Sequence, residues 1–247
     1  MGSLLVVHVT TGHQDRYDLG ARFFCTLSPF RTLSPSGLHE QLMNNRYLWF
    51  VALVSALGGF LFGYDWVVIG GAKPFYEAYF YITQPSQEAW AMSCALVGCL
   101  AGAVRSGFLS ERIGRRRALL VSAAAFAASA LGTEVAMSIT TFVLWRIAGG
   151  VAIGMVSGLS PVYIAEIAPA SSRGKLVCLN ELTIVFSILS AQTVNWLIAR
   201  PMPVGASLLE IQASWNGQQA WRHMFEAAFL PAMVFLAGVC LIPESPR

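Results

Sequence analysis

Residues 145–175 read WRIAGGVAIGMVSGLSPVYIAEIAPASSRGK, an apolar stretch with charged residues near both ends. Between Arg146 and Glu166 lie 19 residues without a charged side chain. At about 1.5 Å per residue, a helix of this length crosses a hydrocarbon core of about 30 Å. We therefore predict a membrane-spanning helix. Three glycines at four-residue spacing predict a face for helix packing, although glycine is common in membrane helices in any case: Gly150, Gly154 and Gly158.

The composition is that of a multi-pass membrane protein. Of the 247 residues, 55% are hydrophobic and only 12% are charged, whereas a soluble domain carries about 25% charged residues. The net charge of +3 is too small to indicate a nucleic-acid partner. Five cysteines without metal-ligand spacing predict free thiols. We find no phosphate-binding loop, nucleophile elbow or metal-binding helix motif, and so expect no enzyme, metal site or cofactor.

Six apolar segments are each long enough to cross the membrane as a helix. This pattern predicts an all-α membrane protein with six transmembrane helices. The predicted spans are residues 47–71, 89–109, 118–137, 141–165, 176–199 and 224–242.

Residues 1–45 differ from the rest, because they mix histidine, acidic and basic residues with proline. We expect a cytoplasmic tail here. The alternative is that translation starts at Met43 and that the preceding residues are an artefactual extension, since MNNR at 43–46 leads directly into the first apolar span.

Basic residues alternate between the connecting loops. The loop 110–117 contains four arginines and the loop 168–175 contains Arg173 and Lys175, whereas the other connections have few basic residues near a membrane end. By the positive-inside rule, both termini lie in the cytoplasm and the chain crosses the cell membrane several times.

Two charges fall inside predicted spans at matching depth. Asp65 lies six residues from the outer end of the first span, and Arg146 lies five residues from the outer end of the fourth. The two could pair if these helices touch. An arginine neighbour lowers the pKa of a carboxylic acid and burial raises it, an opposition that suits a proton carrier. A permanent structural ion pair fits the sequence equally well.

The fifth span carries polar side chains at 180, 183 and 187, near one face of the predicted helix. Such a stripe lines either a cavity or a neighbouring helix, and we favour a cavity. Glu181 lies about 100° away from Asn180 around the same helix.

Several segments resemble the sugar porters of the major facilitator superfamily, and in particular proton-coupled members of the xylose:proton symporter type. The matching segments are FGYD at 62–65, GFLSERIGRR at 107–116, RIAGG at 146–150, PVYIAE at 161–166 with RGK at 173–175, and WR at 221–222 with PESPR at 243–247. They occur in the family's order, and the resemblance as a whole extends over about residues 44–247.

The resemblance implies the N-terminal half of a twelve-helix carrier that binds a monosaccharide between two halves. Residues 46–247 would form this six-helix half, with the lipid bilayer, the sugar and a C-terminal half or second copy as partners. By similarity, Asp65 would carry the coupling proton with Arg146 as its partner, and Phe62 and Glu181 would contact the sugar. A cytoplasmic gate would consist of Glu111, Arg115, Arg116, Glu166, Arg173, Glu244 and Arg247.

Some residues depart from the family pattern. Glu181 stands where the family has a sugar-binding glutamine, Ile188 where xylose-type members have another, and Glu111 where the loop usually has aspartate. The chain also stops after PESPR, at a point where the family motif continues with Trp-Leu. We expect proton-coupled sugar transport by a larger carrier. The alternatives are a non-transporting fragment or half-carrier, and an uncoupled sugar facilitator.

Overall fold

The computed structural model describes residues 35–169, 171–203 and 205–242, with side chains from residue 47 onward. The chain divides into two units, Met1–Asn44 and Asn45–Arg247, and the second contains the helical bundle. The predictions for residues 1–34, Glu244 and Arg247 lie outside the described residues.

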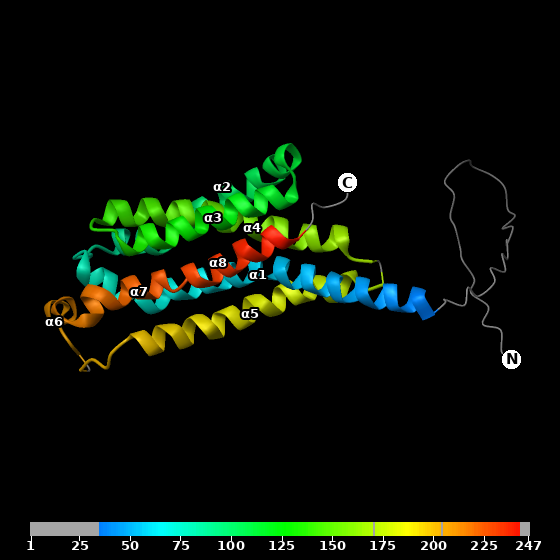
Figure 1. Ribbon diagram of the computed structural model, residues 1–247. Coiled ribbons are helices and arrows are strands. Elements are labelled where there is room, and N and C mark those ends of the chain that lie inside the picture. Colours follow the sequence, from blue (N-terminus) through cyan, green and yellow to red (C-terminus); the bar gives the residue numbers. More distant parts are fainter. Residues whose placement is uncertain (1–34, 170, 204, 243–247) are drawn as a thin grey trace, which may run out of the picture. The chain divides into compact units, whose positions relative to one another are not determined.

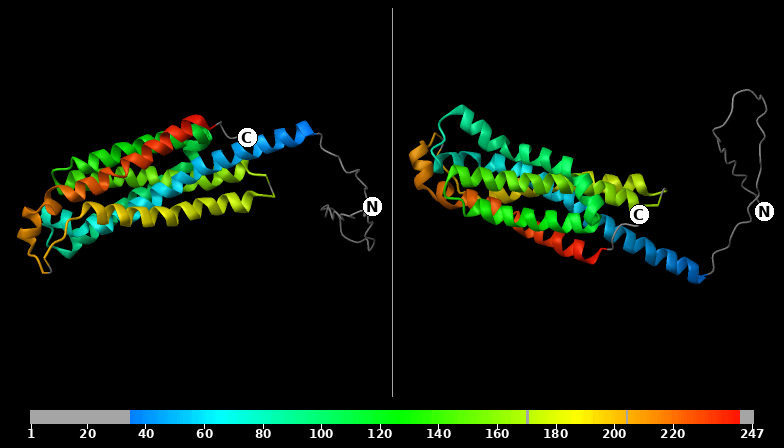
Figure 2. Two further views of the ribbon diagram at one scale, coloured as in Figure 1. Left: turned by 60° about the horizontal axis from the view of Figure 1, so that its bottom comes forward. Right: turned by 90° about the horizontal axis from the view of Figure 1, so that it is seen from above.

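Long helices run side by side along one common direction (Figures 1 and 2). The prediction of an all-helical membrane fold is confirmed, because every regular element within the described residues is a helix. These are α1 (Pro35–Tyr79), α2 (Pro85–Ile113), α3 (Arg115–Glu134), α4 (Ile139–Ile167), α5 (Arg173–Ile198), α6 (Leu208–Ala213), the π-helix η1 (Asn216–Ala220), α7 (Trp221–Glu226) and α8 (Phe229–Leu241).

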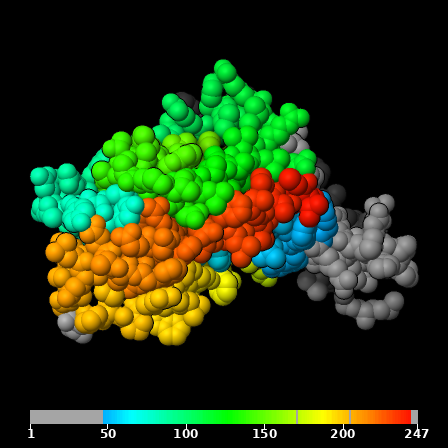
Figure 3. Space-filling model, turned by 60° about the vertical axis from the view of Figure 1, so that its left-hand side comes forward, coloured from blue at the N-terminus to red at the C-terminus, as the bar shows by residue number. Residues whose placement is uncertain are grey.

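Among the described residues, five helical stretches are long and apolar enough to cross a membrane. They correspond to the first, second, fourth, fifth and sixth predicted spans. The segment predicted as the third span is α3, which has charged residues at both ends and many small residues between them. Those charges shorten its apolar part, but α3 packs beside α4 and α8 within the bundle. Figure 3 shows α3 in green next to α7 and α8 in orange to red.

The helix ends differ from the predicted spans where the chain stays helical beyond its apolar part. Helix α1 continues to Tyr79, past the predicted end at residue 71. The sixth span begins at Asn216, earlier than the predicted residue 224, and contains a π-turn before α7. Hydropathy detects where a helix is apolar, whereas backbone hydrogen bonding continues into the polar residues that flank it.

Helices α2 and α4 cross at very short range, because glycines from both helices lie at the contact. A Cβ added at Gly150 or Gly154 of α4 would lie 2.1 Å from a backbone oxygen of α2. A Cβ at Gly98 or Gly102 of α2 would lie 2.2 Å or 2.1 Å from a backbone oxygen of α4. Gly158 faces Ser106 of α2 more loosely, at 3.1 Å. The glycines predicted to form a packing face therefore all face α2.

A buried aromatic cluster joins α1, α4 and α7 near the end of α1. The ring of Phe142 lies 5.1 Å from that of Tyr76, 6.0 Å from that of Trp221 and 5.7 Å from that of Phe225. Aromatic rings at these separations bury large areas and add a favourable contact of about 0.5–1.5 kcal/mol per pair. The cluster fixes α7 against the part of α4 that carries Arg146.

The glycine crossing leads to a test within one helix. Gly102→Ala places a methyl group against a backbone oxygen of α4, whereas Gly107→Ala in the same helix meets nothing within 4 Å. We expect Gly102→Ala to destabilise the bundle by about 1–3 kcal/mol, because an overpacked backbone contact must separate. Gly107→Ala should be neutral or slightly stabilising.

The measurement is the temperature at which half of the detergent-purified protein remains monodisperse after heating. The midpoint should fall by several degrees for Gly102→Ala only. Equal midpoints for the two variants would show that the close approach of α2 and α4 is not needed for stability.

Candidate functional site

Asp65 of α1 and Arg146 of α4 form a buried ion pair. Arg146 Nη2 donates to Asp65 Oδ2 at 3.0 Å, and Arg146 Nη1 donates to Asp65 Oδ1 in a second, parallel hydrogen bond. Asp65 is 8% exposed and Arg146 is 3% exposed. A two-pronged arginine–carboxylate pair of this kind is geometrically specific and is stronger than a neutral hydrogen bond. Removing one partner would leave a buried charge uncompensated.

Phe225 of α7 lies against the same guanidinium group. Its ring centroid is 5.2 Å from Arg146 Cζ, which is within range of a cation–π contact. Phe225 is itself almost fully buried. The guanidinium group therefore contacts both a carboxylate from α1 and an aromatic ring from α7. Phe225 was not predicted from the sequence. The only local signal was its position one turn after Trp221, and this does not reveal which charge it contacts.

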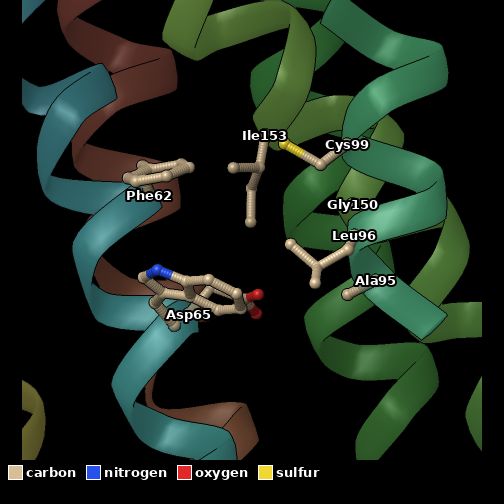
Figure 4. A pocket seen from close by; sticks show the side chains of 8 residues that line it. Phe62, Asp65, Ala95, Leu96, Cys99, Gly150 and Ile153 are labelled. Carbon is tan, nitrogen blue, oxygen red and sulfur yellow. The ribbon is translucent and has the colours of Figure 1, made fainter. Parts of the chain in front are cut away.

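A small pocket borders the ion pair on the side of α2 (Figure 4). Phe62, Asp65 and Trp66 of α1 form one wall, and Figure 4 shows Phe62 extending toward Ile153 of α4. Asp65 thus contacts Arg146 and also borders the pocket. The remaining lining residues are Ala95, Leu96, Cys99 and Gly150.

The pocket combines apolar walls with one charged group. Phe62 and Trp66 offer aromatic rings, and Asp65 offers a carboxylate that is already bound to Arg146. Ligand sites in proteins typically have this composition of mainly apolar walls and few polar groups. The sequence indicated Phe62 and Asp65 but not Trp66 of the same helix. It did not indicate Leu96 or Cys99 either, because α2 meets α1 and α4 at the pocket only in the fold.

The polar stripe of α5 does not line this pocket, and the preference for a cavity was wrong. Asn180 and Ser187 are buried against glycines of α1: a Cβ added at Gly59 would lie 2.8 Å from Asn180 Oδ1, and one at Gly63 would lie 2.1 Å from Ser187 Oγ. Thr183 Oγ1 donates to the carbonyl oxygen of Ala56 in α1 at 2.6 Å. The stripe is therefore the packing surface between α5 and α1.

Glu181 lies beside that packing surface and is exposed. It does not line the pocket that contains Phe62 and Asp65. The structure thus brings Phe62, Asp65 and Arg146 together but places Glu181 apart from them.

The predicted gate residues that are described lie where α2, α3, α4 and α5 end or begin. Arg115 Nη2 lies 3.2 Å from Glu166 Oε1, which joins the start of α3 to the end of α4. Arg115 also donates to Ser110 Oγ of α2. Arg116 donates to the carbonyl oxygens of Val239 at 3.1 Å and Cys240 at 2.6 Å, both in α8.

Two further members of the predicted gate lie on α5 and α2. Arg173 Nη2 approaches the carbonyl oxygen of Ala168 at 3.5 Å, the outer limit for a hydrogen bond. Glu111 is exposed in the last turns of α2. The arginines at 115 and 116 make the contacts that join α3 to α2, α4 and α8 at this end.

Known proteins with similar sequences include several sugar transporters. A family model described as "Sugar (and other) transporter" matches residues 51–247. The D-xylose-proton symporter of Escherichia coli (strain K12) is 37% identical over 229 residues, covering 83% of this chain and 45% of its own length. The galactose-proton symporter of the same strain is 36% identical over 213 residues, covering 86% of this chain and 42% of its own length. These relatives are transporters rather than enzymes.

Solved structures show the same arrangement of helices. A structure of the proton:xylose symporter XylE of the major facilitator superfamily, bound to 6-bromo-6-deoxy-D-glucose, superposes with a TM-score of 0.75 at 36% identity. The match covers 83% of this chain and 46% of XylE. The chain thus spans about half the length of the curated relatives it matches.

The helical bundle, the extent of the family match and the level of identity agree: the chain belongs to the sugar transporter family of the major facilitator superfamily, and its six-helix bundle is an N-terminal half of that fold.

Proposed function

We propose that this chain is the N-terminal half of a twelve-helix carrier that moves a monosaccharide together with a proton, and that Asp65 is the proton-binding group. The observation that carries the proposal is the buried Asp65–Arg146 pair at the edge of an aromatic-walled pocket. Similarity to the xylose- and galactose-proton symporters supports both the substrate class and the coupling ion.

The geometry suggests how a proton could alter the bundle. An ionised Asp65 accepts two hydrogen bonds from Arg146 and holds α1 to α4. Protonation removes the negative charge, so the ion pair becomes a weaker hydrogen bond between the guanidinium group and a neutral carboxylic acid, and the contact with Phe225 stays in place. The helices that line the pocket are then free to shift, and loss of the proton restores the pair.

In this proposal Phe62 packs against the sugar from the wall next to Asp65. Glu181, on the exposed face of α5, contacts the sugar only if the substrate also reaches that face. The second six-helix half, or a second copy of this chain, covers the open side of the site. Both termini lie in the cytoplasm, so the Arg115–Glu166 pair belongs to the inner gate.

Neutralising the carboxylate tests the coupling. One proton moving through 100 mV supplies about 2.3 kcal/mol, enough for about 50-fold accumulation of a neutral sugar. In the full carrier, Asp65→Asn should lose this accumulation while keeping exchange of labelled sugar between equal concentrations. The control is Glu88→Gln in α2, which neutralises a carboxylate outside the pocket.

The assay is uptake of a panel of labelled sugars into vesicles with an imposed proton gradient. If Asp65→Asn accumulates sugar as the parent does, Asp65 is not the coupling site. If the parent itself ignores the gradient, the carrier is a facilitator.

Charge exchange tests the gate. Arg115→Glu and Glu166→Arg should each slow transport, and the double variant should recover part of the rate because the pair reforms in the opposite sense. Since the pair is partly exposed, the coupling between the two changes should be worth about 0.2–1 kcal/mol, or about 1.5- to 5-fold in rate. Arg117→Glu, an exposed neighbour on α3, is the control.

Initial uptake rates of the singles, the double and the control decide the result. If the losses simply add, the ion pair has no part in the transport cycle.

The coding sequence beyond Arg247 distinguishes the assemblies. A frame that continues with Trp-Leu and six further apolar spans supports a twelve-helix carrier. A stop codon directly after Arg247 contradicts it and supports a half-carrier or a fragment without transport activity.

A further inference from the structure

At the end of the bundle remote from Arg115, three side chains with metal-binding atoms come together. They are Glu134, at the C-terminal end of α3, and His223 and Glu226 of α7. One potential ligand atom from each lies within 4.8 Å of those of the other two. All three residues are partly buried. No metal site was predicted from the sequence, since Glu134 and His223 are 89 positions apart and only the packing of α3 on α7 joins them.

The spacing between two residues of α7 would allow both to bind the same metal ion. His223 and Glu226 are three residues apart, so they occupy one face of the helix, and His223 Nδ1 lies 2.7 Å from Glu226 Oε2. A histidine and a glutamate three residues apart on a helix can both reach one metal ion, as in the Glu-x-x-His motif of di-iron proteins, although their order is reversed here. Glu134 approaches from the neighbouring helix and supplies a third donor atom.

The ring of His223 also stacks on an aromatic neighbour, Trp215. Trp215 stacks on His223 with ring centroids 5.7 Å apart and an angle of 27° between the ring planes. Arg200 in turn lies over Trp215, with Cζ 4.6 Å from the ring centroid. A ligand that is already oriented loses less conformational freedom when a metal ion binds.

The guanidinium group of Arg222, the neighbour of His223 in the chain, contacts a backbone oxygen and two aromatic rings. Arg222 Nη1 donates to the backbone carbonyl oxygen of Glu134, and its guanidinium group lies over the rings of Tyr79, at 4.9 Å, and Trp221, at 4.5 Å. Within the described residues, no ion pair or hydrogen bond is formed by the carboxylate of Glu134. This carboxylate is available for a cation.

We propose that Glu134, His223 and Glu226 form a binding site for a divalent transition-metal ion of the zinc type. Imidazole nitrogen and carboxylate oxygen are both ligand types that bind Zn²⁺, and a site with three protein ligands would hold water in the fourth position. Ligand atoms of tetrahedral zinc lie about 3.3–3.5 Å apart, given bonds of about 2.0–2.1 Å. Binding would require side-chain rotations that bring the three atoms to this spacing from separations of up to 4.8 Å. The bound ion would tie the end of α3 to α7.

The test is titration of the purified, detergent-solubilised chain with ZnCl₂, followed by calorimetry and by thermal unfolding. Zinc should bind at one site per chain and raise the unfolding midpoint. His223→Ala and Glu134→Gln should each weaken this binding at least about tenfold, as expected for loss of a metal ligand, and should abolish the thermal shift. Glu210→Gln in α6, which removes a carboxylate outside the group, should bind zinc as the parent does.

The three other histidines, at positions 8, 13 and 39, are retained in all variants and give a constant background. Zinc binding that is unchanged in both His223→Ala and Glu134→Gln would overturn the proposal. Loss in His223→Ala but not in Glu134→Gln would also overturn it, because the site would then lie within α7 and would not link two helices. The conservative variant Glu226→Gln, which keeps the size of the side chain, provides a third measurement if His223→Ala does not fold.

Discussion

The contact between Asp65 and Arg146 places the strongest constraint on this bundle. Two charges buried among apolar helices are costly unless each satisfies the other, so α1 and α4 must remain at the distance that the paired side chains set. The glycines of α2 and α4 let α2 approach α4 closely, so that α2 forms one wall of the pocket beside the pair. Phe225 of α7 packs against the guanidinium group of Arg146. The site therefore depends on the close packing of four helices.

The two ion pairs between helices that the site and the gate contain differ in their exposure to solvent. The Asp65–Arg146 pair is buried and doubly hydrogen-bonded, so changing its protonation state has a large energetic effect. The Arg115–Glu166 pair is partly exposed, and exposed pairs contribute only about 0–1 kcal/mol each. A buried pair suits a site that responds to a proton, and weak exposed pairs suit contacts that break and reform when helices move. Arg116, which binds two carbonyl oxygens of α8, anchors α3 at the same end.

The sequence predicted much of this arrangement, because apolar length and charge placement act locally. It indicated the helices, the glycine face and matching depths for Asp65 and Arg146, which would allow the two to pair if their helices touched. The depths assigned to these two residues were inexact: α1 runs on to Tyr79 and α4 begins at Ile139, so neither predicted span marks a true helix end. Contacts that depend on how the helices are oriented toward one another could not be predicted from the sequence. Asn180 and Ser187 pack on α1 instead of lining a cavity, and neither Phe225 nor the Glu134–His223 proximity has a local signature.

We propose that sugar binding and protonation of Asp65 are linked within one carrier. Linkage requires that a ligand which favours the protonated state draws protons from solution when it binds. The most direct measurement is the pH change in a weakly buffered solution of the detergent-purified full carrier when its sugar is added. We predict uptake of protons on sugar addition, and no uptake in Asp65→Asn. Sugar binding without any proton uptake by the unmodified carrier, across the pH range in which it transports, would contradict this linkage.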